Sequence, residues 1–269
     1  MRWIISFLLT ACLSVFLLSC GGDGEGGPDT QLSGGCNIYA IANGKQCGQT
    51  RGPIAYLALH AGGGYAGSCT GTFVAPNKIV TAAHCLDGVS GITVVSGDYV
   101  SSAVQAIKHP KWKNNVNNRF DIGIVVVADP INSELIPLLA SVAPFVGMRV
   151  QVMGYGLDEN RDPGVSKNPQ EKLKGATMVI TGVDNSYFYS SFDTSDSAIC
   201  LGDSGGPAIG KNVAGLPGLI GVNHAVYAPI DGQGLPICDA EGVVSIFVPI
   251  PDNEIINFIL KHIPEAGIL

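Results

Sequence analysis

Three short segments, far apart in the chain, carry a histidine, an aspartate and a serine in that order. They are Thr81-Ala82-Ala83-His84-Cys85, Phe120-Asp121-Ile122-Gly123 and Gly202-Asp203-Ser204-Gly205-Gly206-Pro207. A serine hydroxyl is a poor nucleophile at neutral pH unless a base takes its proton and a carboxylate orients that base. The glycines around Ser204 suit a tight turn that can aim two backbone N–H groups at a developing oxyanion. The pattern therefore predicts a fold that brings these three segments into one nucleophilic site.

Each of these residues also has a structural interpretation that needs no chemistry. The sequence around Ser204 is typical of a surface turn, and Asp121 could begin a strand and face water. Histidines are more often structural than catalytic, and the chain has five: His60, His84, His109, His224 and His262. Asp121 precedes an apolar run, 122–128, beside which a carboxylate is costly unless it is hydrogen-bonded. This cost favours a histidine partner for Asp121.

Short apolar runs punctuated by glycine make up most of the chain after Cys36. Runs rich in valine and isoleucine, four to eight residues long, occupy 70–74, 78–81, 91–96, 121–128, 148–153, 174–180, 218–222 and 243–250. This rhythm predicts an all-β sandwich or barrel, and the length allows one domain or two fused barrels. One helix is predicted near the end, where Pro251-Asp252-Asn253 can begin it. An apolar stripe follows at Ile255, Ile256, Phe258, Ile259 and Ile263.

The first nineteen residues are typical of a targeting segment that is removed. Arg2 is the only charge before an apolar run, 4–18, which is shorter than the ~20 residues that a spanning helix needs. The sequence Leu17-Leu18-Ser19-Cys20 resembles a bacterial lipobox, which implies export, lipid on Cys20 and a place in the bacterial cell envelope. An uncleaved membrane helix and ordinary secretion are the alternatives. Residues 21–35 are glycine-rich and polar, as in a flexible tether.

The charges and cysteines of the remaining chain limit its partners. Without Arg2, the 15 basic residues become 14 against 22 acidic ones, a net charge of −8, and no basic patch favours nucleic acid. Of the eight cysteines, Cys12 leaves with the targeting segment and lipid would occupy Cys20. Six remain, an even number, which in an exported protein suggests three disulfides. Free buried thiols are the alternative, and a zinc site is disfavoured because the cysteines are not clustered.

Together these sequences resemble the trypsin/chymotrypsin family of serine proteases. The family has a histidine, an aspartate and a serine in the same order, and further matches lie around them. Cys69 and Cys85 are sixteen residues apart, with Cys85 directly after the histidine, and Cys200 stands four residues before the serine. Ile41-Ala42-Asn43-Gly44 is similar to the family's mature N-terminus, and Ala106-Ile107-Lys108-His109-Pro110 to its motif between histidine and aspartate.

The resemblance covers about 41–263 and implies a fold. It implies a protease domain, 41–269, after a signal peptide, 1–19, and a lipid-anchored spacer and propeptide, 20–40. The expected domain has two antiparallel six-stranded β-barrels and a C-terminal α-helix. The first barrel is expected at about 41–130, the second at about 145–250 and the helix at about 252–263. The catalytic residues would then lie in the cleft between the barrels.

The resemblance also implies hydrolysis of peptide bonds through an acyl-enzyme. Ser204 would attack the carbonyl, His84 would act as general base and then as general acid, and Asp121 would orient the imidazole. The backbone N–H groups of Gly202 and Ser204 would form the oxyanion hole. The implied substrates are polypeptides, no cofactor is needed, and a monomer is expected.

The family's disulfides and its activation are implied in the same way. The bridges would be Cys69–Cys85, Cys200–Cys238 and, from the two cysteines left over, Cys36–Cys47. Cutting Ala40–Ile41 would release the α-amino group of Ile41, twelve residues before Pro53 as in the family. That group would pair with Asp203 in a buried ion pair, which organises the pocket more than it stabilises the fold. An ordinary strand residue at Ile41 is the alternative.

The positions that set specificity in the family differ in this chain. Where trypsin-like enzymes carry an aspartate that holds arginine or lysine, this chain has Ala198, followed by Ile199. The pocket walls are expected at Gly221-Val222-Asn223 and at Gly242, so we expect cleavage after small or medium uncharged residues. Gly221 stands where the family more often has a serine that helps to hold the triad aspartate, which predicts a weaker hold on Asp121.

The sequence leaves alternatives to this interpretation. Asn223 and His224 lie near the place of a histidine in bacterial glutamyl endopeptidases, so a preference for glutamate is one alternative. A catalytically weak homologue that acts as a binding module is another, although no triad residue is replaced. An esterase would share the acyl-enzyme chemistry. No metal is expected, because the calcium loop of trypsin has no counterpart: Asp98 is the only carboxylate in 88–105.

Overall fold

The computed structural model describes residues 45–46, 51–113, 118–157 and 173–269. All of them belong to a compact unit, Gln31–Leu269, and the other unit, Met1–Thr30, lies outside the described residues. The predicted signal peptide, the lipid site at Cys20, the cut at Ala40–Ile41 and the Cys36–Cys47 bridge also fall outside them. Within the described ranges, no helix is long and apolar enough to span a membrane.

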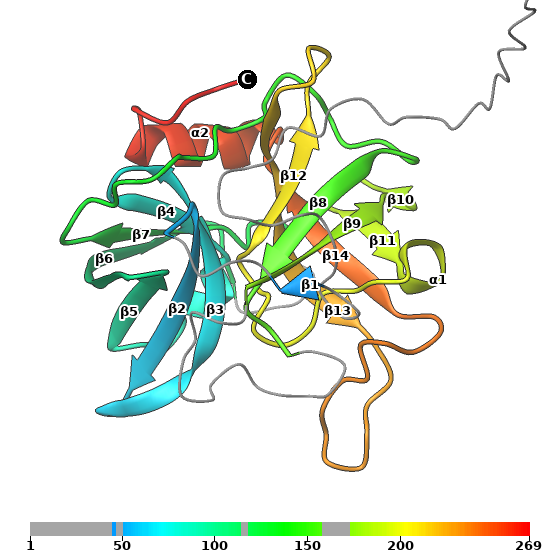
Figure 1. Ribbon diagram of the computed structural model, residues 1–269, viewed down its shortest axis with the longest axis horizontal. Coiled ribbons are helices and arrows are strands. Elements are labelled where there is room, and N and C mark those ends of the chain that lie inside the picture. The colour runs from blue at the N-terminus through cyan, green and yellow to red at the C-terminus, as the bar shows by residue number, and fades with distance from the viewer. Residues whose placement is uncertain (1–44, 47–50, 114–117, 158–172) are drawn as a thin grey trace, which may run out of the picture. The chain divides into compact units, whose positions relative to one another are not determined.

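Six antiparallel strands from the first half of the chain close into a barrel (Figure 1). They are β2 (Ile54–Ala61), β3 (Gly64–Ala75), β4 (Lys78–Thr81), β5 (Gly91–Ser96), β6 (Tyr99–Lys108) and β7 (Gly123–Val127). Around the barrel their order is β2-β3-β4-β7-β6-β5. Alternation along the strands turns branched and aromatic side chains inward, and Leu57, Phe73, Ile79 and Ile124 are all fully buried.

The second sheet has eight strands within the described residues and forms a half-barrel. They are β1 (Lys45–Gln46), β8 (Arg149–Gly154), β9 (Lys174–Val179), β10 (Gly182–Val183), β11 (Phe188–Ser191), β12 (Pro207–Lys211), β13 (Pro217–Tyr227) and β14 (Val244–Pro249). Their order is β1-β9-β8-β12-β13-β14-β11-β10. The predicted all-β fold of two antiparallel sheets is confirmed, but a closed, six-stranded second barrel is not found. In the described residues, β1 and β10 lie at the two ends of this sheet and do not pair with each other.

Helix α2 (Asn253–His262) follows the second sheet and begins where the sequence predicts. The Asp252 side chain caps it by accepting hydrogen bonds from the backbone N–H groups of Glu254 and Ile255. The buried face of α2, which includes Phe258, joins the same hydrophobic cluster as the first barrel. The chain therefore returns from the second sheet to the first barrel at its end.

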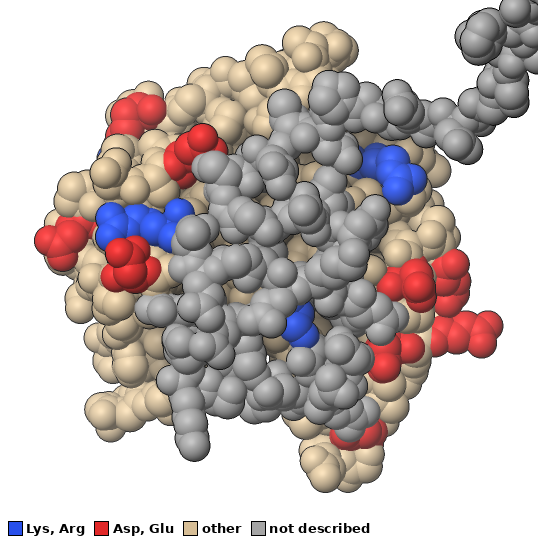
Figure 2. Space-filling view, viewed as in Figure 1, with Lys and Arg blue, Asp and Glu red and all other residues tan. Residues whose placement is uncertain are grey.

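Charged side chains are scattered over the face of the molecule in Figure 2. In the described part of this face, the basic side chains lie in separate places, and those at the left of the view adjoin acidic side chains. The described part of this face therefore presents no continuous basic stripe of the kind that follows a nucleic-acid backbone.

Candidate active site

The pairing of two strands in the first barrel brings His84 and Asp121 together. Thr81, the last residue of β4, lies opposite Gly123, the first residue of β7. The chain therefore leaves β4 toward His84 at the same end of the barrel at which it enters β7 from Asp121. One turn of 3-10 helix, η1 (Ala83–Leu86), carries the histidine.

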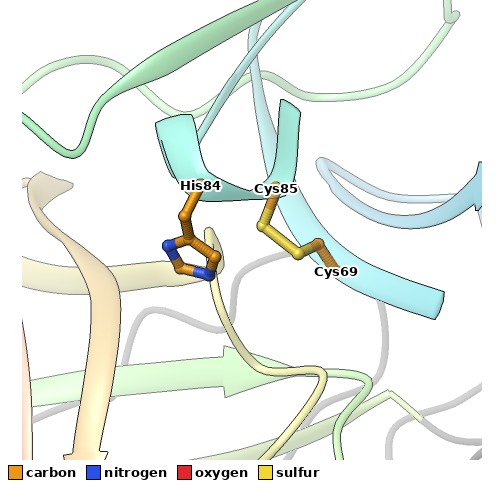
Figure 3. Close-up of side chains that lie close together, drawn as sticks. All are labelled: Cys69, His84 and Cys85. Atoms are coloured by element: carbon orange, nitrogen blue, oxygen red, sulfur yellow. A yellow bond between two sulfur atoms is a disulfide. The ribbon is translucent and has the colours of Figure 1, made fainter. Parts of the chain in front are cut away.

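A disulfide ties η1 to the neighbouring strand. Cys85 of η1 is bonded to Cys69 of β3, and Figure 3 shows the His84 ring beside this bridge. The second bridge implied by the family, Cys200–Cys238, is also present. Both pairings that involve described cysteines are therefore confirmed.

Asp121 holds His84 through two hydrogen bonds. Its Oδ2 lies 2.7 Å from the ring Nδ1 of His84, and its Oδ1 accepts from the backbone N–H of His84 at 2.8 Å. Burial raises the pKa of the Asp121 carboxyl, but hydrogen bonds from His224 and His84 outweigh it and lower the pKa to about 2. The ionised carboxylate can only accept, so the proton of His84 is on Nδ1 and a neutral ring keeps its Nε2 lone pair for a substrate proton.

His224 is the residue of this site that the sequence analysis did not assign. Its Nδ1 lies 2.6 Å from Oδ2 of Asp121, the same oxygen that His84 contacts. The absence of the family's serine at Gly221 predicted a weaker hold on Asp121, but His224, three residues later, supplies a contact. One signal was available: His224 is the only titratable residue of the apolar strand β13 before Tyr227.

Gly221 has a packing role in place of the expected one. It lies in the sheet between Ala208 of β12 and Pro249 of β14. A Cβ at this position would come within 2.4 Å of the Phe188 ring. The absence of a side chain at Gly221 therefore makes room for Phe188, and the contact with Asp121 is made further along the strand.

The turn that carries Ser204 is held by the first barrel. The backbone N–H of Thr70 in β3 donates to the carbonyl of Ser204 at 2.8 Å, and the Thr70 hydroxyl donates to the carbonyl of Gly202 at 2.9 Å. Gly202 and Gly205 both have positive φ, 95° and 82°. A Cβ on Gly205 would also meet the Thr81 hydroxyl at 2.0 Å, so only glycine fits there.

Asn223 holds the same turn from the second sheet. Its backbone exchanges hydrogen bonds with Gly205 and Gly206, and its side-chain Nδ2 donates to the carbonyl of Asp203 at 2.9 Å. Asn223 and its neighbour Val222 are buried. The expected pocket wall at Gly221-Val222-Asn223 therefore lies inside the sheet, where Asn223 supports the nucleophile turn.

Ser204 and His84 line one cavity of about 650 Å³. Its other walls include the Cys69 end of the disulfide and a set of apolar side chains: Leu59, Tyr65, Leu157, Leu201 and Leu235. Gly202, a predicted oxyanion-hole residue, lines the same cavity as Ser204 and His84. Within the described ranges no hydrogen bond joins Ser204 to His84, although catalytic bonds of this kind often form only with substrate bound.

Asp203 lies behind the turn and is fully buried. Its carboxylate accepts from the backbone N–H groups of Gly156 at 2.8 Å and Cys200 at 2.7 Å. Burial raises its pKa to about 7 in spite of these bonds and of the nearby charge of Lys174. Gly154 and Gly156 leave no room for a side chain beside this carboxylate, since a Cβ on either would lie within 2.6 Å of Asp203.

The remaining expected pocket residues lie on both sides of the Cys200–Cys238 bridge. Ala198 and Ile199 are buried, and the Ile199 N–H donates to the Ser245 hydroxyl at 3.1 Å. Gly242 has a φ of 78° and nothing within 4 Å of an added Cβ. The structure therefore leaves open space at Gly242. The side chains of Ala198 and Ile199 are uncharged, so neither supplies a carboxylate to this region.

Comparisons with known proteins agree with this geometry. A structure of neuropsin, described as a serine protease expressed in the limbic system of mouse brain, aligns with a TM-score of 0.61 at 21% identity. The alignment covers 83% of this chain and all of that one, so the two proteins share a fold.

Similar sequences include several named peptidases. A trypsin of Saccharopolyspora erythraea is 31% identical over 54% of this chain and 71% of its own length. An uncharacterized peptidase of Corynebacterium glutamicum (strain R) is 25% identical over 85% and 77%. An ovochymase of Halocynthia roretzi is 26% identical over 52% of this chain, which spans only 10% of that protein. The family model described as Trypsin matches residues 41–237. Because this match covers most of the sequence, the chain belongs to the trypsin family of serine proteases.

Proposed function

We propose that the chain is a serine endopeptidase whose catalytic residues are Ser204, His84 and Asp121. The observation that carries the proposal is that Asp121 holds His84, and that His84 lines the same cavity as Ser204. A family fold alone would be compatible with a binding module, but a binding module has no need of an ionised, buried carboxylate that fixes the tautomer of an accessible histidine.

The proposed reaction uses each of these groups in turn. The Ser204 Oγ attacks the substrate carbonyl carbon while His84 Nε2 takes the hydroxyl proton. The backbone N–H groups of Gly202 and Ser204 stabilise the oxyanion. The C–N bond then breaks, His84 gives its proton to the leaving amine, and the acyl group stays on Ser204. A water molecule, deprotonated by His84, releases the acid and restores the serine.

The residue before the cut bond is proposed to be small or medium and uncharged. Ala198 and Ile199 stand where trypsin-like enzymes hold a cation, and neither supplies a carboxylate. A buried arginine or lysine without a partner is strongly disfavoured. A preference for glutamate is less well supported, because the buried Asn223 and His224 bind the nucleophile turn and Asp121.

Activation by a cut at Ala40–Ile41 is part of the same proposal. Strand β1 pairs with β9, and β9 pairs with β8, in which Gly154 abuts Asp203. Two strand spacings are about 10 Å, and the four residue steps from Lys45 back to Ile41 can span about 13 Å. This estimate supports the proposal that the new N-terminus pairs with Asp203. Export and a lipid anchor at Cys20 remain proposals based on the sequence.

A labelling experiment on the chain that begins at Ile41 tests the proposal. We expect a fluorophosphonate to modify Ser204 and a peptide library to be cut after small or medium uncharged residues. Ser204→Ala should abolish both, because loss of the nucleophile typically lowers kcat by several orders of magnitude. Peptide and ester substrates are compared in parallel. Labelling of the alanine variant, or turnover of esters with none of peptides, would contradict an endopeptidase that uses Ser204.

A further inference from the structure

The carboxylate that orients His84 has a second imidazole partner. Oδ2 of Asp121 lies 2.7 Å from Nδ1 of His84 and 2.6 Å from Nδ1 of His224. Because the carboxylate is ionised, both rings carry their proton on Nδ1 and both donate to one oxygen. Two donors on the same oxygen share one negative charge between them.

A β-bulge places His224 in this position. Asn223 pairs with Phe247 of β14, and Ala225 pairs with Ile246, so His224 is the extra residue of the ladder. Bulges next to active sites re-aim a side chain that regular alternation would direct elsewhere. The residue before the bulge supports the nucleophile turn and the bulged residue contacts Asp121, so one irregularity serves both halves of the site.

The surroundings of His224 are built to hold the ring. Its side chain is 3% exposed, compared with 32% for His84. The Tyr187 ring stacks on it with centroids 5.1 Å apart and planes at 8°. In the described part of the chain, the titratable groups that face His224 include Asp121, His84 at a ring distance of 6.3 Å, and Tyr187. Burial raises the pKa of Tyr187 to about 12, so this phenol stays neutral.

We propose that His224 is a positioning residue of the protease site: it fixes Asp121 and takes part of the carboxylate charge away from His84. This inference rests on the proposed function. A carboxylate with a second donor binds the protonated form of His84 less strongly. The enzyme is then expected to stay active at a lower pH than it would if His84 were the only partner of Asp121. His224 does not line the cavity, so it acts through Asp121 and does not touch the substrate.

Two substitutions separate the donated hydrogen bond from the packing of the ring. His224→Phe keeps an aromatic ring for Tyr187 but has no donor. His224→Asn keeps a donor, because Nδ2 of asparagine is as many bonds from Cα as Nδ1 of histidine. Activity per labelled site is measured against pH for both variants and for the native enzyme. Thermal unfolding is recorded for all three.

In the phenylalanine variant we expect kcat to fall roughly tenfold, the size expected for one hydrogen bond to a charged group. KM should be unchanged, and the acid limb of kcat/KM should move up by about half to one pH unit. The asparagine variant should stay close to the native profile. Two outcomes would overturn the proposal: a folded phenylalanine variant whose kcat/KM has the native acid limb, or an asparagine variant whose profile matches that of the phenylalanine variant. A purely structural role would change stability without moving the acid limb.

Proton NMR of the native chain gives a test that needs neither turnover nor a folded variant. Two far-downfield histidine Nδ1–H resonances are expected, one from His84 and one from His224. A single resonance contradicts the shared carboxylate. Two resonances together with absent peptide turnover would instead contradict the proposed function and leave the arrangement around Asp121 in place.

Discussion

At the scale of single residues, burial of Asp203 opposes the charge of its carboxylate. Its folded pKa is about 7, whereas an unfolded aspartate titrates near 3.9. Between these values the folded chain holds a proton that the unfolded chain has lost. The free energy of unfolding therefore falls as the pH rises from about 4 to 7. An ammonium group beside the carboxylate would lower the folded pKa and remove this loss.

We predict that the cut and uncut chains differ in this pH dependence. In a Ser204→Ala background, which prevents self-digestion, the uncut chain should lose up to ~1.4 kcal/mol per pH unit between about pH 4 and 7. The chain that begins at Ile41 should lose clearly less, because its α-amino group stays protonated up to about pH 7.7. Urea unfolding at both pH values measures the slopes. Asp203→Asn in the uncut chain serves as the control and should flatten the slope; equal slopes in the cut and uncut chains would contradict the ion pair.

At the scale of elements, β13 shows how packing decides which residue reaches the site. Family resemblance suggests a serine at Gly221, but the Phe188 ring occupies the space of its side chain. The contact with Asp121 is supplied beyond the bulge, by His224. Packing within the sheet therefore takes precedence over the family pattern at this position.

Gly221→Ser is predicted to destabilise the protein and to leave Asp121 no better held. The added side chain would overpack against Phe188, which typically costs about 1–3 kcal/mol. Gly64→Ser is the matched control, because a Cβ there meets nothing within 4 Å and its backbone is not left-handed. Unfolding free energies and kcat are measured for both. A serine variant with native stability and higher kcat would show that the hydroxyl can reach Asp121 after all.

The elements that sequence could predict are those with a local signal. The apolar runs at 78–81 and 91–96 coincide with β4 and β5, and Asp252 caps α2 as expected. The two-residue strands β1 and β10 have no period to detect. Regular alternation along the strand could not predict on which face His224 lies. One extra residue in a bulge turns every later side chain to the opposite face. The disulfides near His84 and Ser204 were predictable because the resemblance to the family implies both pairings.

At the scale of the whole molecule, the proposed site depends on contacts between two sheets. The Ser204 turn lies between β11 and β12 of the second sheet, yet Thr70 of the first barrel holds its carbonyls. Asp121 belongs to the first barrel, yet His224 of the second sheet holds its carboxylate. Each sheet thus holds a proposed catalytic segment that the other sheet carries. Activation at Ala40–Ile41 would add a third link, because the new N-terminus enters the second sheet through β1.

Activation is predicted to leave the enzyme attached to its lipid anchor through Cys36–Cys47. Cys36 precedes the proposed cut and Cys47 follows it, so a bridge between them would join the two pieces. The cut follows Ala40, a small residue that fits the proposed specificity, so the enzyme can activate itself. Ala40→Asp should block this step, whereas Ala40→Ser should permit it, because only the charge is disfavoured beside Ala198.

N-terminal sequencing and membrane fractionation measure the outcome. The active enzyme should begin Ile-Ala-Asn-Gly and should stay with the membrane until a reductant releases it. Non-reducing mass analysis should find the Cys36 and Cys47 peptides linked. The Ser204→Ala chain is the control: alone it should stay uncut, and added active enzyme should cut it. Full activity from the uncut chain, or a different first residue, would contradict activation at Ile41. Release from the membrane without a reductant would contradict only the tether, because the cut and the bridge are separate covalent events.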